Sequence, residues 1–252
     1  MKRLKILWVT LSIFIFSIIS LYGQIPIKPV TVQLGGGIGL VSPMGDYGGS
    51  TIDYYAGTKY GMSTGFNIHG KARLGFLGFD LFGELDYAWF SNNGNAEPGT
   101  GSINISQKDF SIKIGPELHF SIPMSPLTPY LSGIISLNTF SGDATFQGTP
   151  RVPSADYSMQ TTERVGLGLG AGIIWNIGSS TKMDIGVQYN FLNAFGKSWD
   201  DINPTISQRV DTYLALNDAK DPQYFYGSNI DFVNSSRAIN TLSLSATLMF
   251  GL

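Results

Sequence analysis

The stretch FSIKIGPELHF, residues 110–120, alternates apolar and polar side chains with a period of two. One face carries Phe110, Ile112, Ile114, Leu118 and Phe120. The other face carries Ser111, Lys113, Glu117 and His119. Successive side chains of a β-strand point to opposite sides of the sheet, so this pattern predicts a strand with one apolar and one polar face.

Seven further segments of about ten residues alternate in the same way. They are residues 30–41, 62–74, 77–90, 127–140, 164–177, 183–195 and 239–252. The connections are alternately long and short, with short ones near Gly75, at SIPMSP (121–126) and at GSST (178–181). This rhythm predicts an all-β fold: an eight-stranded antiparallel up-and-down barrel with short turns at one end and long loops at the other.

Composition favours a barrel that spans a membrane. Charged residues make up 13% of the chain, about half the usual share of a soluble domain. After residue 23 no apolar run approaches the roughly 20 residues that a spanning helix needs. The strands themselves would therefore cross the bilayer, as a transmembrane β-barrel with short periplasmic turns and long extracellular loops. A soluble β-sandwich or barrel with a solvated charged face stays the alternative, because alternation does not say which face is wet.

The first residues, MKRLKILWVTLSIFIFSIISLYGQ, have the layout of a secretory signal. Lys2, Arg3 and Lys5 precede an apolar run from Leu7 to Leu21. We predict a signal peptide at residues 1–23 and a mature barrel domain at residues 24–252, with a retained N-terminal anchor as the alternative. Removal of the signal peptide would change the formal charge of the chain from −2 to −5, which argues against a nucleic-acid partner. The chain has no cysteine, so it has neither a disulfide framework nor a thiolate metal site.

The polar faces of these strands hold a mixed set of charges, which we expect to form a structural charge network inside the barrel. The set comprises His69, Lys71, Arg73, Asp80, Glu84, Asp86, Lys113, Glu117, His119, Arg164 and Asp184. A tight hairpin near Gly75 would place Lys71 close to Asp80 as a cross-strand ion pair. Aromatic residues gather near the strand ends, as the interfacial girdles of membrane barrels do. They are Phe76, Tyr87, Trp89, Phe90, Phe120, Tyr130, Trp175 and Tyr189.

These features together resemble the small outer-membrane barrels of the OmpA/OmpX/OmpW type. The resemblance covers residues 30–252 and rests on QLGGGIGL (33–40), PYL (129–131), GLGLGAGIIW (166–175) and the terminal Phe250-Gly251-Leu252. It implies secretion to the bacterial outer membrane, contact with its lipid, and recognition of the last strand by the barrel-assembly machinery. Because nothing follows the last predicted strand in this sequence, we expect no peptidoglycan-binding domain of the OmpA kind. The final residue here is Leu rather than the aromatic usual in that group.

The candidates for chemistry are few. His69 and His119 would face the lumen near the short turns, and we expect structural rather than catalytic roles for them. A metal site of both histidines with Glu117 is a minor alternative. The GLGLGAG stretch lacks the strand–turn–helix setting and the following Lys of a phosphate loop. We therefore expect no catalytic residue, no cofactor and no metal, and no enzymatic activity.

The last long connection, residues 197–237, is the most unusual segment. Asn203-Pro204 is typical of a helix start, and Ile206, Val210, Tyr213 and Leu214 recur at helical spacing. We predict a helix over residues 204–219 whose apolar stripe folds back on the barrel mouth or docks a partner. Six Asp residues lie in this connection, but their spacing is not that of a calcium loop.

Three functions stay open on this evidence. The first is a structural, adhesion or interaction role carried by the surface loops, with a protein or polysaccharide partner, or a place in a secretion apparatus. The second is a narrow pore or a conduit for small hydrophobic molecules. The third is a lipid-modifying enzyme.

Overall fold

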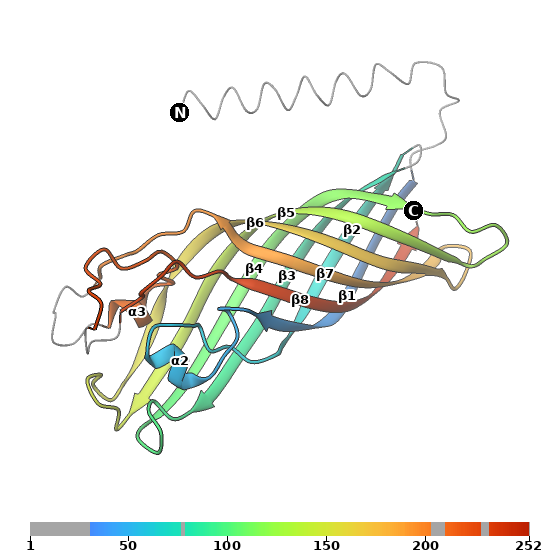
Figure 1. Cartoon of the computed structure of the whole chain (residues 1–252). Helices are drawn as coiled ribbons and strands as arrows, with labels where there is room; N and C mark the ends of the chain where they lie inside the picture. Colours follow the sequence, from blue (N-terminus) through green and yellow to red (C-terminus); the bar gives the residue numbers. More distant parts are fainter. Residues whose placement is uncertain (1–30, 77–78, 203–209, 228–231, 252) are drawn as a thin grey trace, which may run out of the picture. The chain divides into compact units, whose positions relative to one another are not determined.

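The computed structural model describes residues 31–76, 79–202, 210–227 and 232–251. They form a closed barrel in which each strand pairs with its neighbours in the chain and β8 pairs with β1 (Figure 1). The strands are β1 (Thr31–Met44), β2 (Gly65–Gly75), β3 (Asp80–Gly94), β4 (Ser102–His119), β5 (Leu127–Gln147), β6 (Ala155–Asn176), β7 (Thr181–Phe195) and β8 (Asn240–Gly251). All pairs are antiparallel, so the predicted eight-stranded up-and-down barrel is confirmed. The predicted signal peptide lies outside the described residues.

The strands in the middle of the chain are longer than predicted. The alternation predicts a connection between residues 140 and 164, but β5 continues to Gln147 and β6 already begins at Ala155. A bulge explains the error, because the register shifts between Phe140 and Gly142, which pair with Thr162 and Met159. The extra residue on β6 breaks the period-two pattern there and hides the continuation of both strands.

Closure between β1 and β8 depends on the glycines of β1. Gln33 pairs with Gly251, and Ile38 pairs with Ala246. A Cβ atom at Gly37 would overlap the Ala246 carbonyl oxygen and the His69 ring. Glycine at this position therefore lets β2, β1 and β8 approach closely around an inward-pointing histidine. Without such closure the strand edges would leave unpaired N–H and C=O groups in lipid, at several kcal/mol each.

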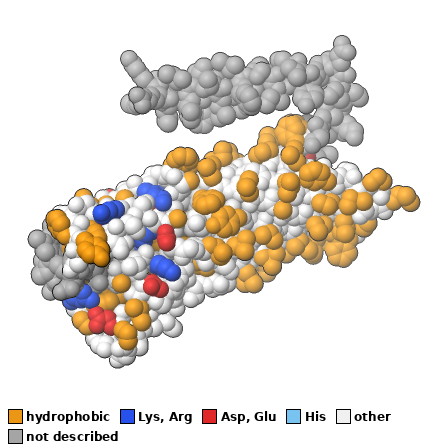
Figure 2. All heavy atoms as spheres, viewed as in Figure 1, with side chains coloured by type: hydrophobic (Ala, Val, Ile, Leu, Met, Phe, Trp, Pro, Cys, Tyr) orange, Lys and Arg blue, Asp and Glu red, His pale blue; other side chains and the backbone are white. Residues whose placement is uncertain are grey.

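The barrel is polar inside and apolar outside. Arg73, Glu117 and Asp184 are at most 2% exposed, whereas Ile38 and Leu169 are 68% and 73% exposed. Figure 2 shows the hydrophobic side chains gathered over one part of the visible face, and charged ones near the end that carries the loops. This polarity is the reverse of a soluble barrel and is what a barrel in a lipid bilayer requires. In the part of the chain that the structure describes, no helix is long and apolar enough to span a membrane.

Two of the expected girdle aromatics point inward instead. Phe90 and Tyr130 are buried, at 3% and 5% exposure. Their positions follow the strand alternation, since Phe90 is in phase with the buried Ala88 and Tyr130 is in phase with the buried Ser132. The expectation from proximity to a strand end is therefore wrong for these two. Phe76, Phe120 and Trp175 are exposed, and Trp89 stacks on Phe66 with ring centroids 4.8 Å apart.

The long connections, at the end of the barrel opposite the short turns, close its mouth. Residues 45–64 include a short helix, α2 (Thr51–Tyr55), and the last connection includes α3 (Asp211–Leu214). Both helices lie at the same end of the barrel in Figure 1. Their aromatic side chains pack against the inner face of the extended β4–β6 wall, where Tyr54, Phe146 and Tyr213 contact one another. We call these packed connections, residues 45–64 and the described part of 196–239, the cap.

The helix predicted over residues 204–219 is present as the short helix α3, but the prediction is wrong beyond Leu214. Residues 203–209 lie outside the described residues, and α3 covers four positions. The backbone becomes extended at Ala215 and reaches a positive φ of 37° at Asn217. The Asn217 side chain donates to the Asp211 carbonyl oxygen at 2.9 Å. An Asn that bonds the local backbone in this way competes with helix and stabilises a turn.

Candidate functional site

The strongest concentration of polar chemistry is inside the barrel, beginning near the short turns. Lys71 and Arg73 of β2 meet Glu117 of β4 and Asp184 of β7. The Lys71 Nζ atom lies 2.6 Å from Glu117 Oε1 and 2.9 Å from Asp184 Oδ2. Arg73 contacts the same two carboxylates, with its Nη2 atom 2.7 Å from Asp184 Oδ2. These four side chains, the lower cluster, balance two positive charges against two negative ones.

Aromatic groups complete the lower cluster. The Tyr130 hydroxyl donates to Asp184 Oδ1 at 2.8 Å, and the Lys71 ammonium lies 5.0 Å from the centre of the Phe82 ring. A buried ion pair is tolerated when its remaining lone pairs and protons are satisfied. Tyr130, placed inward by the β5 alternation, supplies such a hydrogen bond.

The ion pair expected between Lys71 and Asp80 does not form. The register of β2 and β3 places Glu84 opposite Lys71 and Gly75 opposite Asp80. The hairpin is closed by a bond from Phe76 N–H to the Phe79 carbonyl oxygen, so its connection is longer than the turn assumed at Gly75. Asp80 lies instead at the rim, 3.4 Å from His119 Nδ1 and 4.0 Å from Arg73 Nε.

A second group, the upper cluster, lies further along the lumen toward the cap. Lys113 Nζ is 3.0 Å from Glu84 Oε1 and 3.6 Å from Asp86 Oδ1. The Asn67 amide donates to Asp86 Oδ2. Nearby, His69 Nε2 is 2.7 Å from Thr247 Oγ1.

Asp109 belongs to the upper cluster, and sequence reasoning missed it. It is 2% exposed and accepts a hydrogen bond of 2.7 Å from the Ser111 hydroxyl at Oδ2. The signal is present in the sequence, since Asp109 is in phase with Ser111 and Lys113. The predicted strand begins at Phe110, one residue too late to include it.

Arg164 does not join the other lumen charges. Its guanidinium holds the Asp218 carboxylate of the cap in a two-pronged contact, with N···O distances of 2.9 and 2.8 Å. Asn193 and the Ser198 backbone N–H also donate to Asp218, at 2.8 and 2.9 Å. Burial raises the pKa of Asp218, but the hydrogen bonds from Arg164, Asn193 and Ser198 outweigh it and hold the pKa below its ordinary value. This pair joins the last long connection to the barrel wall.

A second arginine stabilises the same connection. Arg237 is 2% exposed and donates to the Asn217 carbonyl oxygen at 2.6 Å. Its guanidinium lies 4.1 Å from the centre of the Tyr60 ring, which joins the two connections of the cap.

The two histidines lie among hydrogen-bonding side chains. His69 and its partner Thr247 are buried, at 7% and 3% exposure. His119 contacts Glu117 and Asp80, each at 3.4 Å. Within the described ranges, no group of three or more His, Cys, Asp or Glu side chains is placed to hold a metal ion.

Comparisons with known proteins bear on the fold. No family model and no curated protein matches this sequence. Neisserial surface protein A is 18% identical over 90% of this chain and 99% of its own, with a TM-score of 0.47. A major outer membrane protein from Thermus thermophilus is 17% identical over 88% of this chain and 100% of its own, with a TM-score of 0.44. At these identities and TM-scores the likeness concerns the fold alone.

The class of the protein follows from its own geometry. It combines a closed antiparallel wall, an apolar exterior and a polar, ion-paired interior. The chain is an eight-stranded β-barrel with the polarity of a membrane-spanning barrel.

Proposed function

We propose that this barrel is sealed and acts through its extracellular end, as an interaction or adhesion protein. The proposal rests on the part of the β3–β6 wall that extends beyond the apolar outer surface of the barrel, the projecting sheet. Its outward side chains are polar, and the cap packs against its inner face. The proposal has two parts, a lumen that does not conduct and a surface that binds.

Three layers of side chains block the lumen. The lower cluster and the upper cluster fill successive levels of the barrel interior. The aromatic side chains of the cap pack against β5 at the mouth, where Tyr47 of the cap and Phe140 and Phe146 of β5 have no exposed surface. An eight-stranded barrel is just wide enough for its own side chains, so the packing of the described residues favours a lumen that is closed to water and ions.

The projecting sheet begins where the outward side chains change from apolar to polar. One row across β3, β4 and β5 consists of Tyr87, Phe110 and Thr139. The next row, closer to the long loops, consists of Trp89, Lys108 and Ser141. Beyond them the outward rows are polar across four strands. They comprise Ser91, Ser106, Asp143 and Ser158, then Asn93, Asn104, Thr145 and Asp156.

A polar groove of about 470 Å³ lies on this outward face. Its polar lining comprises Asn93, Asn95, Ser102, Asn104, Thr145 and Gln147. The lining of the groove has no charged side chain, so its amides and hydroxyls suit a neutral, hydroxyl-rich ligand such as a polysaccharide.

The test is binding of the whole barrel, in lipid nanodiscs, to a panel of immobilised neutral polysaccharides. We expect the triple variant Asn93→Ala, Asn104→Ala, Gln147→Ala to bind at least about tenfold more weakly, because each lost amide removes hydrogen bonds worth about 1 kcal/mol. Gln160→Ala, an exposed amide outside the groove, serves as the control. Equal binding by the triple variant and the wild type would refute the role of this surface.

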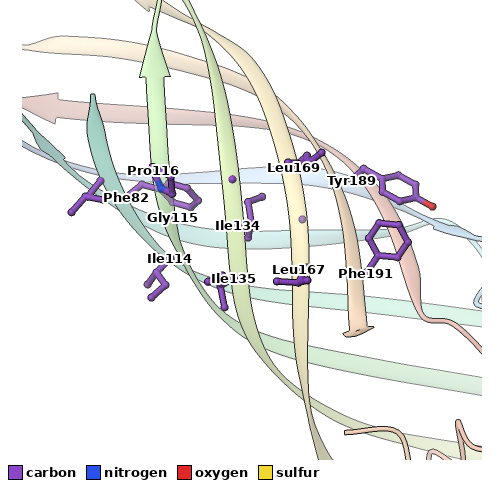
Figure 3. Close-up of a pocket in the computed structure, with 13 residues that line it drawn as sticks. Phe82, Ile114, Gly115, Pro116, Ile134, Ile135, Leu167, Leu169, Tyr189 and Phe191 are labelled. Atoms are coloured by element: carbon purple, nitrogen blue, oxygen red, sulfur yellow. The ribbon is translucent and has the colours of Figure 1, made fainter. Parts of the chain in front are cut away.

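A second candidate function rests on a depression in the lipid-facing wall (Figure 3). This apolar hollow of about 850 Å³ spans β3 to β7 and includes Pro116 and Gly133. The β4–β5 ladder lacks pairs between Ile114–Ile135 and Glu117–Ser132, where Pro116 has no N–H to donate. The apolar lining favours retention of a small hydrophobic molecule at the outer wall of the barrel. Phe82 and Ile134, buried at its floor, separate it from the lumen.

A further inference from the structure

Two adjacent aromatic side chains of the cap are left in water. Phe225 and Tyr226 are 75% and 101% exposed. In the described part of the cap, six other aromatic side chains are at most 6% exposed: Tyr47, Tyr54, Tyr55, Tyr60, Tyr213 and Phe232. Isolated exposed apolar residues are common, but two neighbouring rings left outside a cap that buries six others indicate a contact surface.

The exposed pair belongs to a turn at residues 222–227, which we call the aromatic tip. The Asp221 backbone N–H donates to the Val233 carbonyl oxygen at 2.8 Å. The Asp221 carboxylate accepts a hydrogen bond of 2.7 Å from the Gln223 backbone N–H. Asp221 and Val233 have no exposed surface. The tip is therefore held by a buried base, so its backbone needs little ordering when the tip binds.

This base lies over the mouth of the barrel rather than on its outer wall. The Arg237 backbone N–H donates to the Asp218 carbonyl oxygen at 2.9 Å, which joins the two sides of the base. The Asp218 carboxylate is bound by Arg164, whose side chain points inward from β6. The Arg237 guanidinium lies over the ring of Tyr60, in the first connection of the cap. A tip that starts from this base extends away from the bilayer that holds the barrel.

The charge beside the tip is positive. The Lys220 Nζ atom lies 5.6 Å from the centre of the Tyr224 ring. The sequence of the tip, PQYFYG at residues 222–227, contains no acidic residue. Aromatic rings and a lysine are the side chains typical of the region between lipid head groups and water, and the cation attracts acidic head groups.

We propose that the aromatic tip inserts into the head-group region of a second phospholipid membrane, which faces the barrel from outside. Lipid surrounds an inserted side chain on all sides, so it suits a ring as exposed as that of Tyr226. A polysaccharide fits less well, because no protein surface supports this ring as a platform for a sugar. The inference goes beyond the polar groove of the proposed function, with which the tip shares no residue.

The test is flotation of phosphatidylcholine vesicles, with or without phosphatidylserine, after mixing with the whole barrel in lipid nanodiscs. We expect the wild type to float with the vesicles. The double variant Phe225→Ser, Tyr226→Ser should bind at least about tenfold more weakly, because two rings lose their burial in lipid. Ile52→Ser, which removes an apolar side chain 40% exposed on α2, should bind as the wild type does. Lys220→Gln should lower binding about fivefold, and only to vesicles with phosphatidylserine.

A second double variant separates insertion from a structural role of the tip. Phe225→Trp, Tyr226→Trp should bind the vesicles at least as tightly as the wild type, because Trp favours the lipid interface. The triple variant of the polar groove should also retain vesicle binding, so a failure of polysaccharide binding leaves this result unaffected. The proposal is overturned if the wild type binds neither kind of vesicle, or if the serine double variant loses polysaccharide binding and keeps vesicle binding.

Discussion

Glu117→Ala should lower the free energy of unfolding by about 3–5 kcal/mol, because it leaves Lys71 and Arg73 to share the single carboxylate of Asp184. Glu117 has no exposed surface, so water cannot solvate the charges it leaves behind. The measurement is urea unfolding of the barrel in phospholipid vesicles, followed by tryptophan fluorescence.

The matched control is an ion pair of the same type at the surface. Arg151 and Glu97 lie 3.0 Å apart, with both side chains 39% exposed. Glu97→Ala should therefore change the free energy of unfolding by no more than about 1 kcal/mol. If Glu117→Ala proved equally mild, the lower cluster would not be a structural element of the barrel.

Asp218→Ala should open the cap while leaving the barrel wall intact. The substitution strands the Arg164 guanidinium and removes the acceptor of Asn193 and Ser198. A loss of about 3 kcal/mol at a buried pair corresponds to an increase of roughly a hundredfold in the open population. Limited proteolysis within residues 196–239 should accelerate by that factor. Asp201→Ala, an exposed carboxylate of the same connection, should have little effect.

Acid should reproduce this opening in the wild type. The pKa of Asp218 is lower in the folded chain than its ordinary value, so the stabilisation is complete above the unfolded pKa of about 3.9. It is lost as the pH falls below that value through the folded pKa. Cleavage of the wild-type cap by an acid-active protease should therefore rise below about pH 4, and the Asp218→Ala protein should show a smaller rise. Identical pH profiles would contradict the assigned role of Asp218.

The barrel could be predicted from sequence because its signal is repeated and local. The alternation around FSIKIGPELHF recurs in every strand, and closure follows once an open edge in lipid is ruled out. The interior set was also visible in the alternation, and Lys71, Arg73, Glu84, Asp86, Lys113, Glu117 and Asp184 are all buried.

The ion pairs inside the lumen could not be predicted, because they depend on the strand register and on side chains that span the barrel to contact non-adjacent strands. Lys71 contacts Asp184 of β7 rather than Asp80 of the adjacent β3, and Arg164 contacts Asp218 of the cap. The bulge at Phe140 and the left-handed Asn217 are single-residue departures that period-based reasoning passes over.

The most direct test of the central claim is the ion conductance of the wild-type protein in a planar lipid bilayer. Folding is verified first by faster gel migration of the unboiled protein than of the boiled one, and insertion by co-flotation of the protein with lipid vesicles before they are fused to the bilayer. A sealed barrel should then show no current steps across the voltage range, because the two ion clusters and the aromatic cap block the lumen. Regular single-channel steps from inserted wild-type protein would contradict the claim and would identify the barrel as a pore.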